Sequence, residues 1–133
     1  MNRRMTAVLV GVAVAAVINH FIVGGFGGNI PFNVGRVVIS FVAGWLFVSH
    51  AHGSLWVAAS AGPLVMLIDH VLLKGGYFVW VHFFWPELVQ GEGLLAAGGV
   101  LISFVMFAPL VAACSWAGGF LARRRVHDVQ MHP

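Results

Sequence analysis

The sequence predicts an all-α integral membrane protein with four transmembrane helices. Of its 133 residues, 60% are hydrophobic and 8% are charged, whereas a soluble domain carries roughly 25% charged residues. The apolar residues gather in four long segments, each of which can be compared with the roughly 20 residues that a helix needs to cross the bilayer. The basic residues lie at the ends of these segments, which is membrane topology. The expected partner is therefore the lipid bilayer and not nucleic acid.

The four segments match the length of a membrane span to different degrees. The first and third, residues 5–23 and 55–73, have the required length. The second, residues 34–50, is slightly short. The fourth, residues 94–122, is long enough to require tilt, a kink or protrusion from the bilayer. Pro109 is the expected kink point, because proline removes a backbone donor and crowds the preceding turn.

The first segment has some features of a signal peptide. Residues 1–5 form a basic start, and residues 13–16 read AVAA, which resembles a cleavage site. The apolar run nevertheless continues to Val23, beyond that site. A retained helix is therefore expected, and residues 1–122 are predicted to form one four-helix membrane domain.

The orientation in the membrane follows from the distribution of Lys and Arg. Most of the Lys and Arg residues lie beside the start of the first segment and the end of the fourth, which places both termini in the cytoplasm. The expected location is the plasma (inner) membrane. Residues 123–133 are then expected to be a basic, disordered cytoplasmic tail. Five basic residues lie on the terminal side and two on the other: Arg3, Arg4, Arg123, Arg124 and Arg125 against Arg36 and Lys74.

An aromatic segment, residues 77–88, separates the third and fourth apolar segments. Six aromatic residues fall between Tyr77 and Trp85, and Trp and Tyr favour the headgroup region because they combine an apolar ring with a polar tip. We expect an interfacial piece, such as a short helix, that ends before Pro86. An aromatic belt is the favoured interpretation, and a lid over an outward-facing site is the alternative.

Several short motifs occur twice in the same order, which predicts a tandem repeat of a two-helix unit. Apolar segments share few residue types, so chance similarity is the alternative. If the repeat is real, both units cross the membrane in the same direction, and the second carries the aromatic segment as an insertion. The paired motifs are VINH (17–20) and LIDH (67–70), the glycine pairs 24–25 and 75–76, and VVISFV (37–42) and VLISFV (100–105).

The repeated polar pairs lie at the outer ends of their helices in this topology. An ionisable residue within a membrane helix is costly and requires a partner. For Asp69, the best candidate is Arg36 at the outer start of the second helix. The simplest interpretation is an interhelical polar clasp. The cluster expected at the outer end of the bundle comprises Asn19, His20, Arg36, Asp69 and His70.

Small residues recur at helical spacing on three of the segments. Such residues let helix backbones approach closely in lipid, where no hydrophobic force joins helices. They therefore predict helix-packing seams. The seam residues are Gly11 and Ala15 on the first segment, Ala58 and Gly62 on the third, and Ala108, Ala112, Ser115 and Gly119 on the fourth.

Three functions are compatible with these features. The first is a structural or accessory membrane subunit that self-associates or joins a larger membrane complex. The second is a metal or haem protein with its site near the outer face, although the sequence requires no cofactor and lacks compact ligand motifs such as H-E-x-x-H. The third is a small oligomeric transporter or channel, since buried acidic and His residues serve such paths. The candidate metal ligands are His20, His70, Asp69 and His82.

Soluble-enzyme chemistry finds no support in the sequence. There is no G-x-S-x-G motif, no P-loop and no dinucleotide fingerprint. The single Cys114 excludes an intrachain disulfide and a Cys-based zinc site. His50 and His52 occupy a short predicted turn, where solvation is the ordinary state and weak metal binding is the alternative. The protein is therefore not expected to be an enzyme.

Overall fold

The computed structural model of the protein describes residues 3–88 and 93–131, and all of its regular elements in these ranges are helices. The prediction of an all-helical chain with four membrane-length helices is confirmed. Length and hydropathy identify the spans as Arg3–Val23, Asn29–Ser49, Leu55–Phe84 and Leu101–Arg125.

The first hairpin is almost continuously helical. Helix α1 (Arg3–Ile18) runs on through a π-helical segment η1 (Asn19–Val23) and the short α2 (Gly24–Phe26), and α3 follows as Asn29–Ser49. Gly28 separates α2 from α3 with φ of 77°, a left-handed conformation that glycine adopts without steric cost. This break lets α3 begin before residue 34, where we had expected the second span.

The connection between α3 and α4 is a tight turn, as expected for residues 50–53. The Gly53 amide donates to the Phe47 carbonyl at 2.7 Å, which folds the chain back on itself. Ser54 then caps α4 (Leu55–Leu67) by accepting a hydrogen bond from the Val57 amide.

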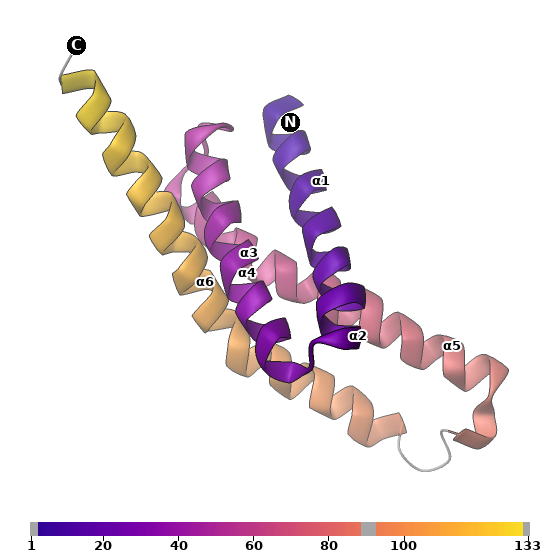
Figure 1. Ribbon diagram of the computed structural model, residues 1–133. Helices are drawn as coiled ribbons and strands as arrows, with labels where there is room; N and C mark the ends of the chain where they lie inside the picture. The colour runs from indigo at the N-terminus through magenta and orange to yellow at the C-terminus, as the bar shows by residue number, and fades with distance from the viewer. Residues whose placement is uncertain (1–2, 89–92, 132–133) are drawn as a thin grey trace.

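The second hairpin is longer than the first. Helix α4 continues through the π-helical segment η2 (Ile68–Gly75) into α5 (Gly76–Phe84), and η3 (Pro86–Leu88) is a 3-10 turn. The helix continues through the glycine pair 75–76 and meets no proline before Pro86, so the third span extends past residue 73. Figure 1 shows α5 and the beginning of α6 projecting beyond the first hairpin.

Helix α6 spans Gly93–Met131 and contains Pro109. It continues through residues for which we had expected a disordered tail. No Gly or Pro interrupts the sequence between Gly119 and Met131, and basic side chains near a helix C-terminus interact favourably with the helix dipole. The start of α1, the α3–α4 turn and the end of α6 lie at one end of the molecule (Figure 1), which we call the terminal end, and the opposite end the distal end.

Helices α3, α4 and α6 pack closely through glycines. A Cβ atom on Gly44 would collide with the Ser115 backbone, and one on Gly62 with the Val111 backbone. Of the predicted seam residues, Ala58, Gly62, Ser115 and Gly119 are buried, and Ala108 and Ala112 are partly buried.

Helix α1 is packed differently from the other three spans. Val12 and Ala16 are its buried residues among those described. Ala15 is partly buried, whereas Gly11 is exposed, and a Cβ atom on Gly11 would meet nothing within 4 Å. The small-residue face expected to pack α1 therefore makes no close backbone contact at Gly11.

Candidate functional site

Both repeated polar pairs lie in π-helical segments at the distal end. Asn19 and His20 open η1, and Asp69 and His70 lie at the start of η2. A π-helical turn contains an extra residue, and such turns occur frequently at functional sites. The α-helix resumes at the glycine pair in both cases, at Gly24 and at Gly76. The two sequence motifs thus adopt the same local structure.

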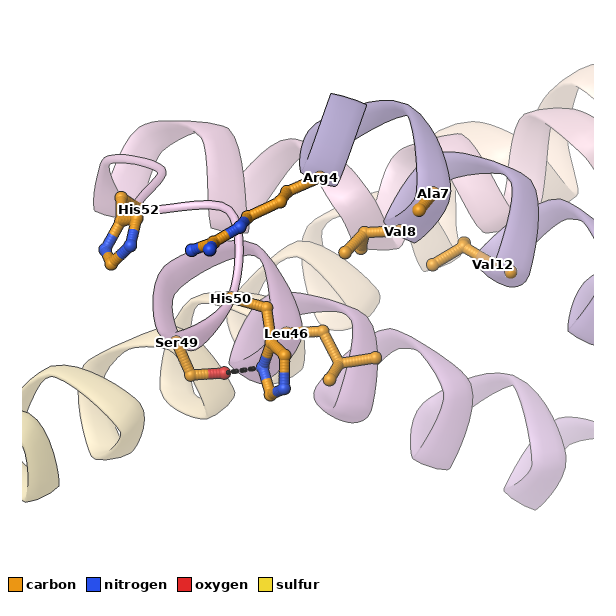
Figure 2. Close-up of a pocket in the computed structure, with 9 residues that line it drawn as sticks. Arg4, Ala7, Val8, Val12, Leu46, Ser49, His50 and His52 are labelled. Atoms are coloured by element: carbon orange, nitrogen blue, oxygen red, sulfur yellow. Dashed lines mark hydrogen bonds between the residues drawn. The ribbon is translucent and has the colours of Figure 1, made fainter. Parts of the chain in front are cut away.

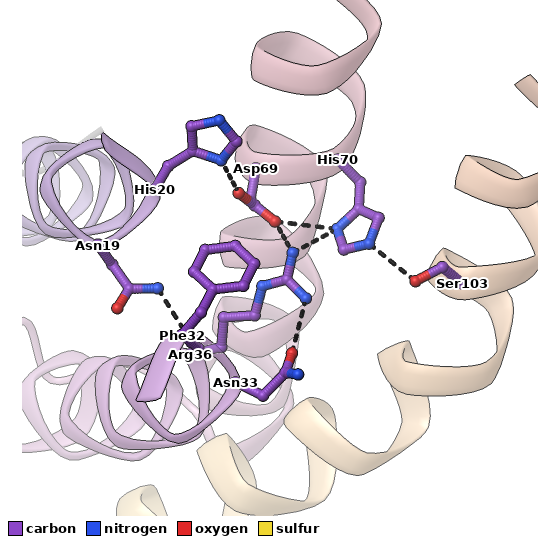
Figure 3. Close-up of polar contacts among 8 residues, drawn as sticks. All are labelled: Asn19, His20, Phe32, Asn33, Arg36, Asp69, His70 and Ser103. Carbon is purple, nitrogen blue, oxygen red and sulfur yellow. Dashed lines mark hydrogen bonds and ion pairs between the residues drawn. The ribbon is translucent and has the colours of Figure 1, made fainter. Parts of the chain in front are cut away.

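Asp69 is the centre of a buried ionic cluster (Figure 3). It is 2% exposed. Its Oδ1 contacts His20 Nδ1, and its Oδ2 forms an ion pair with Arg36 Nη2. His70 Nδ1 lies 3.1 Å from the same Oδ2. A carboxylate charge inside an apolar span is thereby matched by the guanidinium charge of Arg36 and by the imidazole of His20, as an apolar environment requires.

Arg36 reaches the cluster from α3. Its Nη1 donates to Asn33 Oδ1 at 3.1 Å, and its guanidinium carbon lies 4.1 Å from the centre of the Phe32 ring. The planar guanidinium presents several donors at fixed angles and can stack on an aromatic face. Asn33 and Phe32 therefore hold Arg36 in the position from which it pairs with Asp69.

His70 links the carboxylate to α6. Its Nδ1 lies 3.0 Å from Arg36 Nη2, and its Nε2 lies 2.9 Å from Ser103 Oγ. Because a guanidinium only donates hydrogen bonds, Nδ1 accepts from Arg36, and the ring proton is assigned to Nε2, which donates to Ser103. Both ring nitrogens of His70 are thus engaged within the cluster. The network now contacts all four spans.

Asn19 lies beside the cluster but makes a different contact. It is 5% exposed, and its Nδ2 donates to the Phe32 carbonyl at 3.2 Å. Gly35 leaves the space for this amide, because a Cβ atom there would overlap the Asn19 side chain. Asn19 therefore fastens the end of the first span to the start of α3 by a hydrogen bond to backbone and not to Asp69.

Ser103, Asn33 and Phe32 were not among the residues that we selected from the sequence. A signal for Ser103 was present, because it is the Ser of the second ISFV motif. Its counterpart in the first motif, Ser40, is also buried and donates to the Arg36 carbonyl at 2.7 Å. The Ser40 bond is to the α3 backbone one turn earlier, whereas Ser103 contacts a side chain of the cluster.

A cavity of about 340 Å³ lies next to the cluster at the distal end. His20 lines it and also contacts Asp69, with 20% of the His20 side chain exposed. Lys74 also lines the cavity, with its Nζ 5.6 Å from the centre of the Phe32 ring. The buried carboxylate is therefore separated from this cavity by one imidazole ring.

The four candidate metal ligands are not all brought together. His20, Asp69 and His70 are in contact, but His82 lies on α5, where its ring stacks on Phe78 with centroids 6.4 Å apart. Within residues 3–88 and 93–131, no group of three or more His, Cys, Asp or Glu side chains is arranged to hold a metal ion. A cation at Asp69 would also have to displace the guanidinium of Arg36.

Comparison of the chain with protein-family models, with curated proteins and with solved structures finds no match.

Proposed function

We propose that this protein is a structural, non-enzymatic membrane subunit that self-associates. The observation that carries the proposal is the ionic cluster, in which one carboxylate and its partners contact all four spans. A cluster of this kind fixes the relative positions of helices, since a displaced helix would leave a charge buried without a partner. A defined helix arrangement is what a membrane scaffold needs.

The contacts within the cluster support a structural role over a catalytic one. The Asp69 carboxylate contacts His20 and Arg36, and both ring nitrogens of His70 have partners inside the protein, whereas Arg36 Nε is buried without a hydrogen-bond partner among the described residues. A catalytic or metal-binding group must direct at least one such atom toward its ligand. In this cluster, the atoms with the strongest charges are directed toward each other.

Self-association is proposed to use the aromatic arm, which we define as α5, Gly76–Phe84. None of its residues is buried, and it carries no charged residue. Trp80 packs edge-on against Trp85 with ring centroids 4.8 Å apart. Aromatic residues are enriched at the centre of protein interfaces and pair with similar residues on the partner. A second copy would supply the same aromatic surface.

The proposed location is the plasma (inner) membrane with both termini in the cytoplasm. Arg3 and Arg4 at the start of α1 and Arg123 to Arg125 near the end of α6 lie toward the terminal end. The positive-inside rule favours the cytoplasm for that end. The cluster and the aromatic arm would then face the outer side.

The test is the oligomeric state of the purified protein in detergent, measured by native mass spectrometry. We expect the wild type to form a defined oligomer and Trp80→Ala to shift it toward the monomer. Trp56→Ala is the matched control, because Trp56 is a more exposed tryptophan, 86% against 47% for Trp80, and lies at the start of α4 outside the arm. A monomeric wild type, or equal effects of the two variants, would overturn the assembly proposal.

Transport of protons or a small solute is the second candidate, and a specific observation favours it. His20 lines the distal cavity and contacts the buried Asp69, so a proton has a short route from the cavity to the carboxylate. Flux into liposomes that is lost in Asp69→Asn, while the variant keeps its fold, would establish transport. Wild-type protein without flux would exclude it and leave the structural role.

The metal or haem expectation is tested separately. Elemental mass spectrometry of the wild type, beside a His20→Ala/His70→Ala variant, measures any bound metal. Iron, zinc or copper that is stoichiometric with the chain and lost in the variant would replace the structural proposal with a ligand site.

A further inference from the structure

A second cavity, of about 640 Å³, lies at the terminal end, away from the ionic cluster. It lies between the first turns of α1 and the end of α3 with its following turn (Figure 2). Its volume falls within the roughly 300–1,000 Å³ of sites that bind small molecules. The residues that line it are Arg4, Ala7, Val8, Gly11, Val12, Leu46, Ser49, His50 and His52.

The walls of this cavity are apolar, and the small side chains that α1 presents there leave it open. Gly11 lines the cavity, and a Cβ atom added to it would meet nothing within 4 Å. Ala7 lies one turn before Gly11 and is also part of the wall. The small residues of α1 thus leave an open groove between α1 and α3. In a bilayer, such a groove is filled by a hydrocarbon chain.

The polar residues of the cavity gather at one end of this groove. Figure 2 shows Arg4 extending from α1 toward the turn that carries His50 and His52. Ser49 Oγ donates to the Trp45 carbonyl at 2.8 Å and lies 2.9 Å from His50 Nδ1. Because the single hydroxyl proton goes to Trp45, Ser49 accepts from His50 and fixes the orientation of its ring.

His52 occupies a left-handed position in the turn that lines the cavity. It is the one non-glycine residue with positive φ, 53°, in the described backbone. This conformation is uncommon for most residues with a side chain, and His is among those that adopt it more often. Gly53, which follows it, would have been the easier position for a left-handed turn. The turn instead holds His52 at the cavity.

From these features, we infer that the cavity is a binding site for an anionic phospholipid. The lipid phosphate would contact Arg4 and His52, and an acyl chain would lie along the groove at Gly11. Basic pockets between transmembrane helices on the cytoplasmic side are suited to anionic headgroups. The combination of a cationic mouth and a lipid-facing apolar wall fits a phospholipid better than a free anion, which would leave the groove empty.

The test is native mass spectrometry of the protein after exposure to phosphatidylglycerol or phosphatidylcholine with identical acyl chains. We expect selective retention of phosphatidylglycerol. Arg4→Gln should reduce its apparent affinity by about fivefold, the effect of one basic residue near an anionic lipid surface. Arg3→Gln is the matched control, because Arg3 is the adjacent basic residue on α1 and does not line the cavity. Equal retention of both lipids, or equal effects of both variants, would overturn the inference.

Gly11→Leu tests the groove independently of charge. The added side chain has space within the folded protein, so the variant should fold normally and displace the acyl chain, reducing lipid retention at least tenfold. Gly99→Leu is its control, since Gly99 is an α6 glycine that likewise has nothing within 4 Å of a Cβ position. A Gly11→Leu variant that retains the lipid would overturn the inference. A change in oligomeric state without a change in lipid retention would instead assign the groove to a second copy.

Discussion

Helix α1 and the other three spans are held in the protein by different means. Helices α3, α4 and α6 approach until glycine backbones touch neighbouring backbones, as at Gly44 and Gly62. Helix α1 has an open groove at Gly11, and its first π-helical segment is fastened through His20 and Asn19. Three spans therefore form a closely packed unit. The first span adjoins it through Val12 and Ala16, which are part of the apolar core, and through polar contacts at the distal end.

This difference separates two sources of order in a membrane protein. Close packing of small residues provides dispersion energy along the full length of a helix, because lipid supplies no hydrophobic force between helices. A buried ionic contact adds less net stability but permits one arrangement of charges. The packed unit depends on the first effect, and the position of α1 depends on both, since Val12 and Ala16 join the apolar core and His20 contacts Asp69.

The largest expected effect comes from removing the centre of the cluster. Asp69→Ala leaves Arg36 buried without a counter-charge, so we expect the free energy of unfolding to fall by about 3–5 kcal/mol. The measurement is unfolding in mixed micelles, followed by tryptophan fluorescence.

The matched control for Asp69→Ala is the double variant Arg36→Met/Asp69→Leu. It removes both charges and fills the space, so it should recover most of the lost stability. If both variants are as stable as the wild type, the cluster does not hold the spans together.

A smaller effect is expected from widening the packed unit. Gly62→Ala places a Cβ atom against the Val111 backbone and 2.9 Å from the Ala112 amide nitrogen, which forces α4 and α6 apart. The expected loss is about 1–3 kcal/mol in the same unfolding assay. Gly99→Ala should instead be neutral or stabilising by up to about 1 kcal/mol, because its site is open and alanine favours the helix. Equal stability of the two variants would contradict the close approach at Gly62.

The smallest effect is expected where α1 is fastened. His20→Ala removes one contact to Asp69 and should cost only about 0.6 kcal/mol, the average for a polar contact between membrane helices. Its effect should be local. Hydrogen exchange in nanodiscs should become faster in Asn19–Val23 and stay unchanged in α4. His82→Ala, on the aromatic arm, is the control. Faster exchange throughout the protein after His20→Ala would mean that α1 belongs to the packed unit.

The sequence was sufficient to predict the number and approximate positions of the spans. Their ends were harder to place, because hydropathy marks where a helix is apolar and not where it stops. The third span passes residue 73 because the helix tolerates the glycine pair 75–76 and meets no proline before Pro86. We did not predict that η1 and η2 are π-helical. The extra residue in a π-helical turn is stabilised by contacts with other helices, which the local sequence does not reveal.

The charged part of the candidate site was predictable, because few basic residues are available to pair with a buried acid. A buried Asp69 needs a cation, and Arg36 is the basic residue on the same side of the membrane that lies close to a helix start, so the pair followed from topology. Ser103 and Asn33 could not be selected in this way, because neutral polar residues tolerate many environments. The cavity at Arg4 and His52 was also missed, because predicting it requires knowledge of how α1 and α3 lie relative to each other.

The order of residues in the cluster has a consequence for biosynthesis. A chain is made and inserted from its N-terminus, so His20 and Arg36 reach the membrane before Asp69, and Ser103 comes last. Arg36 lies near the distal start of α3, where a long basic side chain can extend toward the headgroups until its partner arrives. Asp69 is shorter and cannot reach the headgroups so easily, but it enters a membrane in which both of its upstream partners are already present. The nascent protein is therefore never required to hold this acid in lipid alone.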